Sequence, residues 1–376
     1  MTFLELERLT KTFPDGTPAV CGIDLAIVEG EFVVLLGPSG CGKTTTLRML
    51  AGLEPPSAGR VRIDGADVTA LPPSRRDVGF VFQFYALYPH LTVAENVAFP
   101  LECARVERAE RERTVAATLA RLGLDALRRK LPHELSGGDQ QRVALARAMV
   151  RRPKLFLMDE PLGTLDTELR LEMCEFLRAR QLELGVTTVY VTHDQEEAMR
   201  LADRIVVMSE GRILQAASPG VVYDEPAHLF VARFVGSPGM NLVLGDVRRQ
   251  GAQLLFHPEP PPTPGKRRAE TDVDADGFPS SPGNLPVIPL PGEVRLGPVV
   301  LGIRPEFLRL ERGGPVRARV RLEEYQGATR CLHLESGLGS FVVRLAGASP
   351  AGTEVELALD PAHLRLFDPK TGARLA

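Results

Sequence analysis

The sequence predicts a mixed α/β domain over residues 1–240 and a small all-β domain over residues 241–376. Up to about residue 240, short apolar runs alternate with helical patterns, which is typical of a largely parallel sheet with helices on both faces. From residue 299 onward, short segments of period-two alternation between glycine turns indicate a small β-barrel. Residues 257–298 are rich in proline and charge, and we expect much of this insertion to be a flexible loop, because it has too little apolar surface to become ordered.

The apolar runs of the first domain are the expected strands of its sheet. Tight turns such as EGEF and SEGRI border them, and the range from about 88 to 150 is expected to form a helical subdomain. The expected strands comprise residues 32–36, 78–83, 155–160, 187–193 and 204–215. Ligands of such sheets gather at the carboxyl ends of the strands, so polar residues that follow these runs are candidates for a common site.

Composition limits the classes of protein to which the chain can belong. Its 45 lysines and arginines stand against 48 acids, a formal net charge of −3, which gives no general electrostatic attraction to nucleic acid. The five cysteines are scattered without a C-x-x-C pair, which argues against a disulfide framework or a zinc site. The acidic start is unlike a signal peptide, and no apolar run approaches the roughly 20 residues of a membrane span. We therefore expect a soluble protein of a reducing cytosol, with no nucleic-acid partner.

The clearest motif directly follows the run 32–36. The segment GPSGCGKT matches G-x-x-x-x-G-K-T, with its last glycine at Gly42 and then Lys43 and Thr44. Glycines let backbone N–H groups wrap phosphates, Lys43 brings charge to the outer phosphates, and the Thr44 hydroxyl is a ligand for Mg²⁺. Because a strand precedes the motif and a helical pattern follows it, the sequence predicts a P-loop nucleotide site. Cys41 is interpreted as a small space-filling residue within it.

Three further polar sites stand at the ends of expected strands. Asp159 ends a buried run, where a carboxylate holds Mg²⁺ through water, and Glu160 beside it is the candidate general base. Adjacent acids after a strand are also common at helix starts, and the P-loop together with the motifs below favours the catalytic interpretation. His193 is interpreted as a contact to the γ-phosphate or the attacking water, and Gln83 as an amide that senses Mg²⁺ and water.

Two other segments invite a functional interpretation. LSGGDQQR begins with Ser136, Gly137 and Gly138 at the start of a helical pattern, which is a second small-residue site for an anion. The segment FYALYPHLT, residues 84–92, is unusually apolar for a loop. Its residues alone leave open whether it belongs to the core or forms a partner site.

These motifs, in this order, closely resemble the ATP-binding subunit of an ABC transporter. The segments FQFYALYPHLTVAENVAFPL, THDQEEAMRLADRIVVM, FVGSPGMNL and LGIRPE resemble the branch that imports carbohydrates, of the maltose and glycerol-3-phosphate type. The resemblance implies an ABC ATPase domain of the P-loop NTPase fold, with ATP and Mg²⁺ as cofactors. It also implies that the tail is an OB-like regulatory domain of the TOBE type.

The resemblance assigns roles to individual residues. The implied catalytic residues are Glu160, His193, Gln83 and Lys43. The implied metal ligands are Thr44, Gln83 and Asp159. The implied nucleotide contacts are Phe13, which stacks on adenine, together with Gly37, Pro38, Ser39, Gly40, Cys41, Gly42, Lys43, Thr44, Thr45, Ser136, Gly137, Gly138 and Asp166.

The resemblance also implies an assembly. Such subunits form dimers with two ATP molecules at the interface, so Ser136 and the two glycines after it would serve the partner's ATP, and Asp166 would signal across the dimer. The implied partners are a second copy or a related subunit, two membrane permease subunits that contact YALYPH, and indirectly an extracytoplasmic solute-binding protein. The implied location is the cytoplasmic side of the inner membrane, and the implied cargo is a sugar or a similar solute.

Several positions depart from the family's pattern. Asp139 replaces the glutamine that usually ends L-S-G-G-Q, and we hypothesise that its charge weakens ATP-driven closure of the dimer. Gly163 and Thr164 replace a serine and a small or amide residue, and Phe307 stands where histidine is frequent.

Other functions remain open at this point. An ATPase of a polyamine, iron or sulfate importer is an alternative, as is an ABC ATPase whose β-domain mainly acts as a regulatory binding module. An ABC protein of DNA repair or translation is disfavoured, because the chain has one P-loop and no long heptad pattern.

Overall fold

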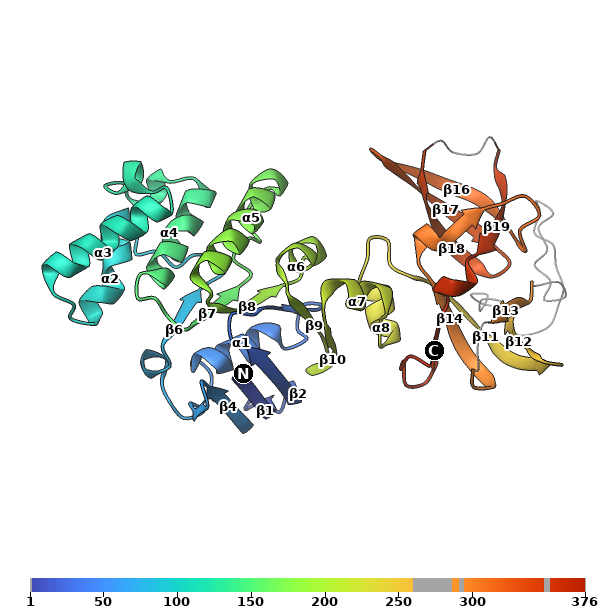
Figure 1. Cartoon of the computed structure of the whole chain (residues 1–376), viewed down its shortest axis with the longest axis horizontal. Helices are drawn as coiled ribbons and strands as arrows, with labels where there is room; N and C mark the ends of the chain where they lie inside the picture. The colour runs from blue at the N-terminus through green and yellow to red at the C-terminus, as the bar shows by residue number, and fades with distance from the viewer. Residues whose placement is uncertain (1, 260–285, 291–293, 348–351, 376) are drawn as a thin grey trace. The chain divides into compact units, whose positions relative to one another are not determined.

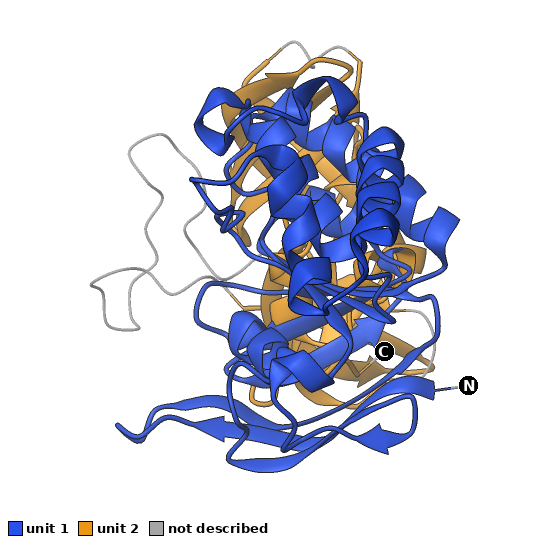
Figure 2. Ribbon diagram, turned by 90° about the vertical axis from the view of Figure 1, so that its left-hand side faces the viewer, with its two compact units in different colours: residues 1–219 blue, residues 220–376 orange. Residues whose placement is uncertain are grey.

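The computed structural model describes residues 2–259, 286–290, 294–347 and 352–375. The chain divides into two compact units, residues 1–219 and 220–376 (Figure 2). This division lies before the boundary near residue 240 that the sequence suggests. None of the helices in the described ranges has the length and apolar character that spanning a bilayer requires.

A six-stranded sheet forms the centre of the first unit. Its order is β10-β9-β3-β8-β7-β6, with β10 antiparallel to β9 and the other neighbours parallel. Strands β3, β7 and β8 are buried along their whole length, as expected for a sheet covered on both faces. In sheet order the strands are Arg212–Ala217, Arg204–Ser209, Phe32–Leu36, Thr187–Thr192, Leu155–Asp159 and Val78–Val81.

Helices cover both faces of this sheet. Figure 1 shows α1 on one side of the strands and α5 and α6 on the other. Helices α2, α3 and α4 form the expected helical subdomain, and α2 begins with a capping box between Thr92 and Glu95. The helices are α1 Lys43–Ala51, α2 Val93–Cys103, α3 Arg108–Arg121, α4 Gly137–Met149, α5 Thr167–Leu184 and α6 Gln195–Leu201.

A second sheet of the first unit is absent from the sequence-based expectation. It is antiparallel, with the order β2-β1-β4-β5. Its buried residues share one core with β3, β7 and β8. The period-two alternation of TFLELERL was the available signal for its first strand. The strands are Pro18–Val28, Thr2–Thr12, Ala58–Ile63 and Ala66–Asp67.

The second unit begins with the short helices α7 (Pro219–Asp224, which starts at the boundary) and α8 (Leu229–Phe234), followed by two antiparallel sheets around one core. The first sheet has the order β13-β12-β11-β14-β20: Ile288–Leu290, Gln253–Pro258, Asn241–Gln250, Gly297–Ile303 and Arg365–Phe367. The second has the order β15-β19-β16-β17-β18: Leu308–Leu310, Glu354–Leu359, Val316–Gln326, Thr329–Ser336 and Gly339–Ala346. The mixed α/β fold followed by an all-β fold is thereby confirmed.

The proline-rich range 257–298 is partly regular structure. Strand β12 extends to Pro258, and Ile288–Leu290 form β13, which pairs with β12. The expectation was of a flexible loop over much of the range, which these short strands leave untested. The expectation of a flexible loop concerns mainly residues 260–285 and 291–293, which lie outside the described residues.

Arg304 joins the start of the second unit to its sheets. It follows β14 and is 2% exposed. Its guanidinium donates hydrogen bonds to the carbonyls of Tyr223, Ala232 and Val235, and lies 4.1 Å from the centroid of the Tyr223 ring. Arg304 is one of several contacts between residues 220–235 and the β-sheets, beside the hydrogen bond from Arg365 on β20 to the Asp224 carbonyl and the core that Ala232 shares with Val300 and Phe367. These contacts explain why the second unit begins before its first strand.

We predict that Arg304→Lys lowers the free energy of unfolding by about 2–4 kcal/mol, because the shorter ammonium group cannot reach all three carbonyls and leaves buried acceptors unpaired. Calorimetry on the full chain measures the loss. Arg309→Lys is the control, since its side chain is 70% exposed in an ion pair with Asp360, and we expect a change within about 0.5 kcal/mol. Equal stability of the two variants would contradict the proposed linking role of Arg304.

Candidate functional site

Four neighbouring strands deliver the polar residues that the sequence singles out. Strands β3, β8, β7 and β6 are adjacent and parallel, so their carboxyl ends lie along one edge of the sheet. The P-loop follows β3, His193 follows β8, Glu160 follows β7, and Gln83 follows β6 by two residues. Strand β6 ends at Val81, so Gln83 lies in a loop and not at the end of a strand as expected.

The P-loop leads into α1, whose first N–H groups have no side-chain cap. Its last glycine, Gly42, has φ +102°, and a Cβ there would lie 2.4 Å from the carbonyl oxygen of Ala19. The ammonium group of Lys43 donates hydrogen bonds to the carbonyls of Gly37 at 2.7 Å and Pro38 at 3.0 Å. A positive helix end and a buried lysine within one loop make a site for an anion.

The remaining residues of the loop differ in exposure. Ser39 and Gly40 are exposed, and Thr45 is half-buried on α1. Cys41 is 4% exposed, and burial raises the pKa of its thiol. A Cβ on Gly37 would lie 2.8 Å from the Cys41 sulfur, so the thiol fills the space beside the loop. This packing agrees with the interpretation of Cys41 as a space-filling residue.

Thr44 and Asp159 lie in direct contact at the edge of the sheet. The Thr44 hydroxyl donates a hydrogen bond of 2.8 Å to Asp159 Oδ1. Burial raises the pKa of Asp159, and the hydrogen bond from Thr44 partly opposes this shift. Hydroxyl and carboxylate oxygens fit Mg²⁺, which commonly takes one or two protein ligands and completes its shell with phosphates and water. Across the described residues, no group of three or more His, Cys, Asp and Glu residues could hold a metal ion.

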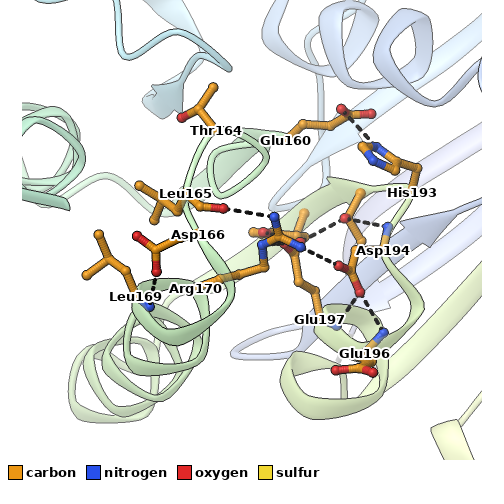
Figure 3. Close-up of polar contacts among 12 residues, drawn as sticks. Glu160, Thr164, Leu165, Asp166, Leu169, Arg170, His193, Asp194, Glu196 and Glu197 are labelled. Atoms are coloured by element: carbon orange, nitrogen blue, oxygen red, sulfur yellow. Dashed lines mark hydrogen bonds and ion pairs between the residues drawn. The ribbon is translucent and has the colours of Figure 1, made fainter. Parts of the chain in front are cut away.

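Glu160 is the point on which the other polar residues converge. Its Oε2 is 3.3 Å from Gln83 Nε2 and 3.1 Å from His193 Nδ1. Figure 3 shows the contact with His193. Its backbone has φ +44°, a left-handed conformation that is costly for a residue with a side chain, and its N–H bonds the carbonyl of Val191 at 3.0 Å. A carboxylate held by two polar side chains, one from the loop after β6 and one directly after β8, is suited to orient a water molecule.

Asp166 lies on the segment that follows Glu160, at the start of α5. Its side chain caps that helix by accepting a hydrogen bond from the N–H of Leu169 at 3.0 Å. Arg170, one turn further on, donates to the carbonyl of Leu165 and to Asp194 Oδ2, both at 2.9 Å (Figure 3). Asp194 in turn caps α6, directly after His193. The segments that carry Glu160 and His193 are therefore connected through Arg170, which the sequence reasoning missed.

Ser136, Gly137 and Gly138 lie at the start of α4 in the helical subdomain, and Figure 1 shows α4 apart from α1. The Ser136 hydroxyl accepts from the N–H of Asp139 at 3.2 Å and donates to its carboxylate at 2.7 Å. Arg142 binds the other carboxylate oxygen at 2.9 Å. The Ser136 hydroxyl is therefore already hydrogen-bonded to Asp139 of the same chain.

Phe13 lies in the turn between β1 and β2, where its N–H bonds the carbonyl of Thr17 at 2.9 Å. Its ring is half-exposed, and Lys11 Nζ lies 5.5 Å from the ring centroid. An aromatic ring in a turn is available to stack on a planar ligand, unlike a ring in the core.

Comparison with known proteins agrees with this arrangement. Residues 20–163 match the ABC transporter family, and residues 301–367 match the TOBE domain. The chain is 42% identical to the sn-glycerol-3-phosphate import ATP-binding protein UgpC of Paraburkholderia xenovorans (strain LB400), over 100% of this chain and 99% of that protein. It is 43% identical to the trehalose/maltose import ATP-binding protein MalK of Thermococcus litoralis (strain ATCC 51850 / DSM 5473 / JCM 8560 / NS-C), over 99% of each chain.

A solved structure supports the same assignment for the first unit. The cbiO1 protein of Clostridium perfringens, part of the ABC transporter complex cbiONQ, is 33% identical with a TM-score of 0.56, over 60% of this chain and 91% of that one. With near-complete coverage at above 40% identity by import ATP-binding proteins, the chain belongs to the ABC transporter family as an ATP-binding ATPase subunit that carries a TOBE domain.

Proposed function

We propose that this subunit hydrolyses ATP with Mg²⁺ to energise a membrane importer of sugars or sugar-like solutes, including glycerol phosphate. The observation that carries the proposal is the convergence of Gln83 and His193 on Glu160, at the sheet edge that also presents the P-loop. The cargo is inferred from the relatives, whose names refer to the import of glycerol 3-phosphate, trehalose and maltose.

The nucleotide would be held by the P-loop and the turn at Phe13. Lys43 and the uncapped N–H groups of α1 bind the phosphates, while the half-exposed ring of Phe13 stacks on adenine. The residues that contact the phosphates are Gly37, Pro38, Ser39, Gly40, Cys41, Gly42, Lys43, Thr44 and Thr45. Thr44 and Asp159 would hold Mg²⁺, with Gln83 as a further ligand, and the bound ion would neutralise charge that develops on the phosphate oxygens.

Glu160 is the general base of this proposal. Its carboxylate accepts a proton from the attacking water as the new bond to the γ-phosphorus forms and the bond to the β,γ-bridging oxygen breaks. Gln83 and His193 fix the orientation of that carboxylate, and His193, which is more than half exposed, also reaches the γ-phosphate. Lys43 stabilises the charge on the transferred phosphoryl group.

The assembly completes the site in this proposal. Two copies of the chain form a dimer in which Ser136, Gly137 and Gly138 of one copy bind the ATP of the other, and Asp166 lies at the contact between them. Two permease subunits bind the segment YALYPH, residues 85–90, on the cytoplasmic side of the inner membrane, and a solute-binding protein delivers the cargo outside.

We predict that Glu160→Gln lowers the rate of ATP hydrolysis at least about 100-fold while ATP binding is retained, because the amide keeps the shape of the side chain but cannot accept the proton. Phosphate release and equilibrium nucleotide binding measure the two properties. Glu175→Gln, which removes an exposed acid from α5, is the matched control and should hydrolyse ATP normally. Full hydrolysis by Glu160→Gln would exclude this residue as the base.

The import function predicts a response to solute. In liposomes that contain the subunit with its co-purified permease and solute-binding protein, we expect a sugar or glycerol phosphate to stimulate ATP hydrolysis several-fold, because loaded binding protein favours the closed dimer. A panel of maltose, trehalose, glycerol 3-phosphate, spermidine, ferric iron and sulfate identifies the cargo. Stimulation by one of the last three alone would replace the sugar proposal with an alternative.

Asp139 provides a test of the dimer. Asp139 lies in the first turn of α4, where its carboxylate accepts a hydrogen bond from the Ser136 hydroxyl. Its negative charge also offsets the positive end of the helix. We predict that Asp139→Gln strengthens ATP-dependent dimerisation of the Glu160→Gln background about two- to fivefold, as sedimentation would measure. Glu110→Gln, in the first turn of α3, makes the same change of net charge as a control. No gain with Asp139→Gln would reject the repulsion hypothesis.

A further inference from the structure

The segment that follows Gln83 has a strained backbone. Tyr85 has φ +60° and Ala86 has φ +48°, both in the left-handed region that residues with side chains rarely adopt. This conformation is costly for a residue with a side chain, so it persists only where neighbouring groups hold it. The Tyr85 side chain is buried at 8% exposure, whereas Phe84 beside it is 75% exposed.

Arg147 holds this strained backbone in place. From α4, its guanidinium donates hydrogen bonds to the carbonyls of Tyr85 at 2.7 Å and Ala86 at 2.6 Å. The same group lies 5.5 Å from the centroid of the Tyr88 ring. Burial lowers the pKa of Arg147, and these charge-assisted bonds compensate for the desolvation of its guanidinium. The direction of the Tyr85 side chain is thereby fixed.

The Tyr85 side chain reaches the segment that follows Glu160. Its hydroxyl and that of Thr164 are 2.6 Å apart, a short hydrogen bond between positions 79 residues apart in the chain. Thr164 lies on the segment just after Glu160 (Figure 3). In that turn the N–H of Gly163 bonds the Glu160 carbonyl. Two contacts therefore join the same two segments: this short one and the 3.3 Å bond from Gln83 to Glu160.

The two contacts differ in strength. The bond from Gln83 to Glu160 is at the long end of the hydrogen-bond range and is sensitive to small shifts, whereas the hydroxyl pair is close to the optimum. The shorter contact consequently sets the separation of the segments. We propose that Tyr85 and Thr164, supported by Arg147, are positioning residues that hold Gln83 against Glu160 for hydrolysis.

This inference rests on the proposed function and is tested with the full chain. We expect Thr164→Val and Tyr85→Phe each to lower kcat for ATP hydrolysis about three- to tenfold, with KM for ATP unchanged, because each removes the same hydrogen bond and leaves the P-loop intact. The double variant should be no slower than the slower single variant. Thr164→Ser, which keeps the hydroxyl, should restore kcat to within twofold of the unchanged chain.

The controls separate positioning from general damage. Thr167→Val removes an exposed hydroxyl at the start of α5 and should hydrolyse ATP normally. Losses that multiply in the double variant, a raised KM, or equal damage by Thr164→Ser would each overturn the inference. Glu160→Gln is measured alongside: if that variant hydrolyses ATP, the proposed function fails, whereas an inactive Glu160→Gln with fully active Thr164→Val and Tyr85→Phe rejects only the positioning role.

Discussion

The parallel pairing of β3, β8, β7 and β6 is the constraint on which the site depends. Because these strands are neighbours and run in one direction, residues that follow them meet although the chain separates them widely. Thr44 and Asp159 are 115 positions apart and form a hydrogen bond of 2.8 Å. A shift of register in a strand that is buried on both faces would disturb its packing, so the core fixes the spacing of the polar residues above it.

The sequence predicts the parts of this arrangement that have a local signal. Apolar runs indicate the central strands, and the P-loop motif identifies Lys43 and Thr44. Once a P-loop is recognised, Glu160 at the end of a buried strand becomes the candidate general base. The antiparallel sheet was not predicted although its first strand alternates visibly, because such alternation is a weaker signal than the continuous apolar runs of β3, β7 and β8. Arg170 and Arg147 leave no such signal, since each acts on backbone carbonyls whose proximity arises only in the folded chain.

The two small-residue helix starts are physically unequal. Helix α1 begins after Gly42 with no side-chain cap and no acid in its first turn, so its positive end is available to a phosphate. Helix α4 begins after Ser136, whose hydroxyl is already bonded to Asp139, and Arg142 neutralises that carboxylate. An anion at α4 must displace the internal carboxylate or share its donors. We therefore expect an anion to bind more weakly at the start of α4 than at the start of α1.

The strained residues of the site show why its geometry is carried by distant groups. Glu160 and Tyr85 both have positive φ without being glycine, and neither segment favours that conformation by itself. A glycine would adopt this conformation at lower cost. It would also visit other conformations, and it has no side chain to contact the neighbouring groups. A backbone bond to Val191 holds the strand end that carries Glu160, and Arg147 holds the segment after Gln83. Contacts from β8 and α4 offset the strain of these two backbone positions. Substitutions in β8 or α4 are therefore expected to alter the positions of Glu160 and Gln83 without contacting the nucleotide.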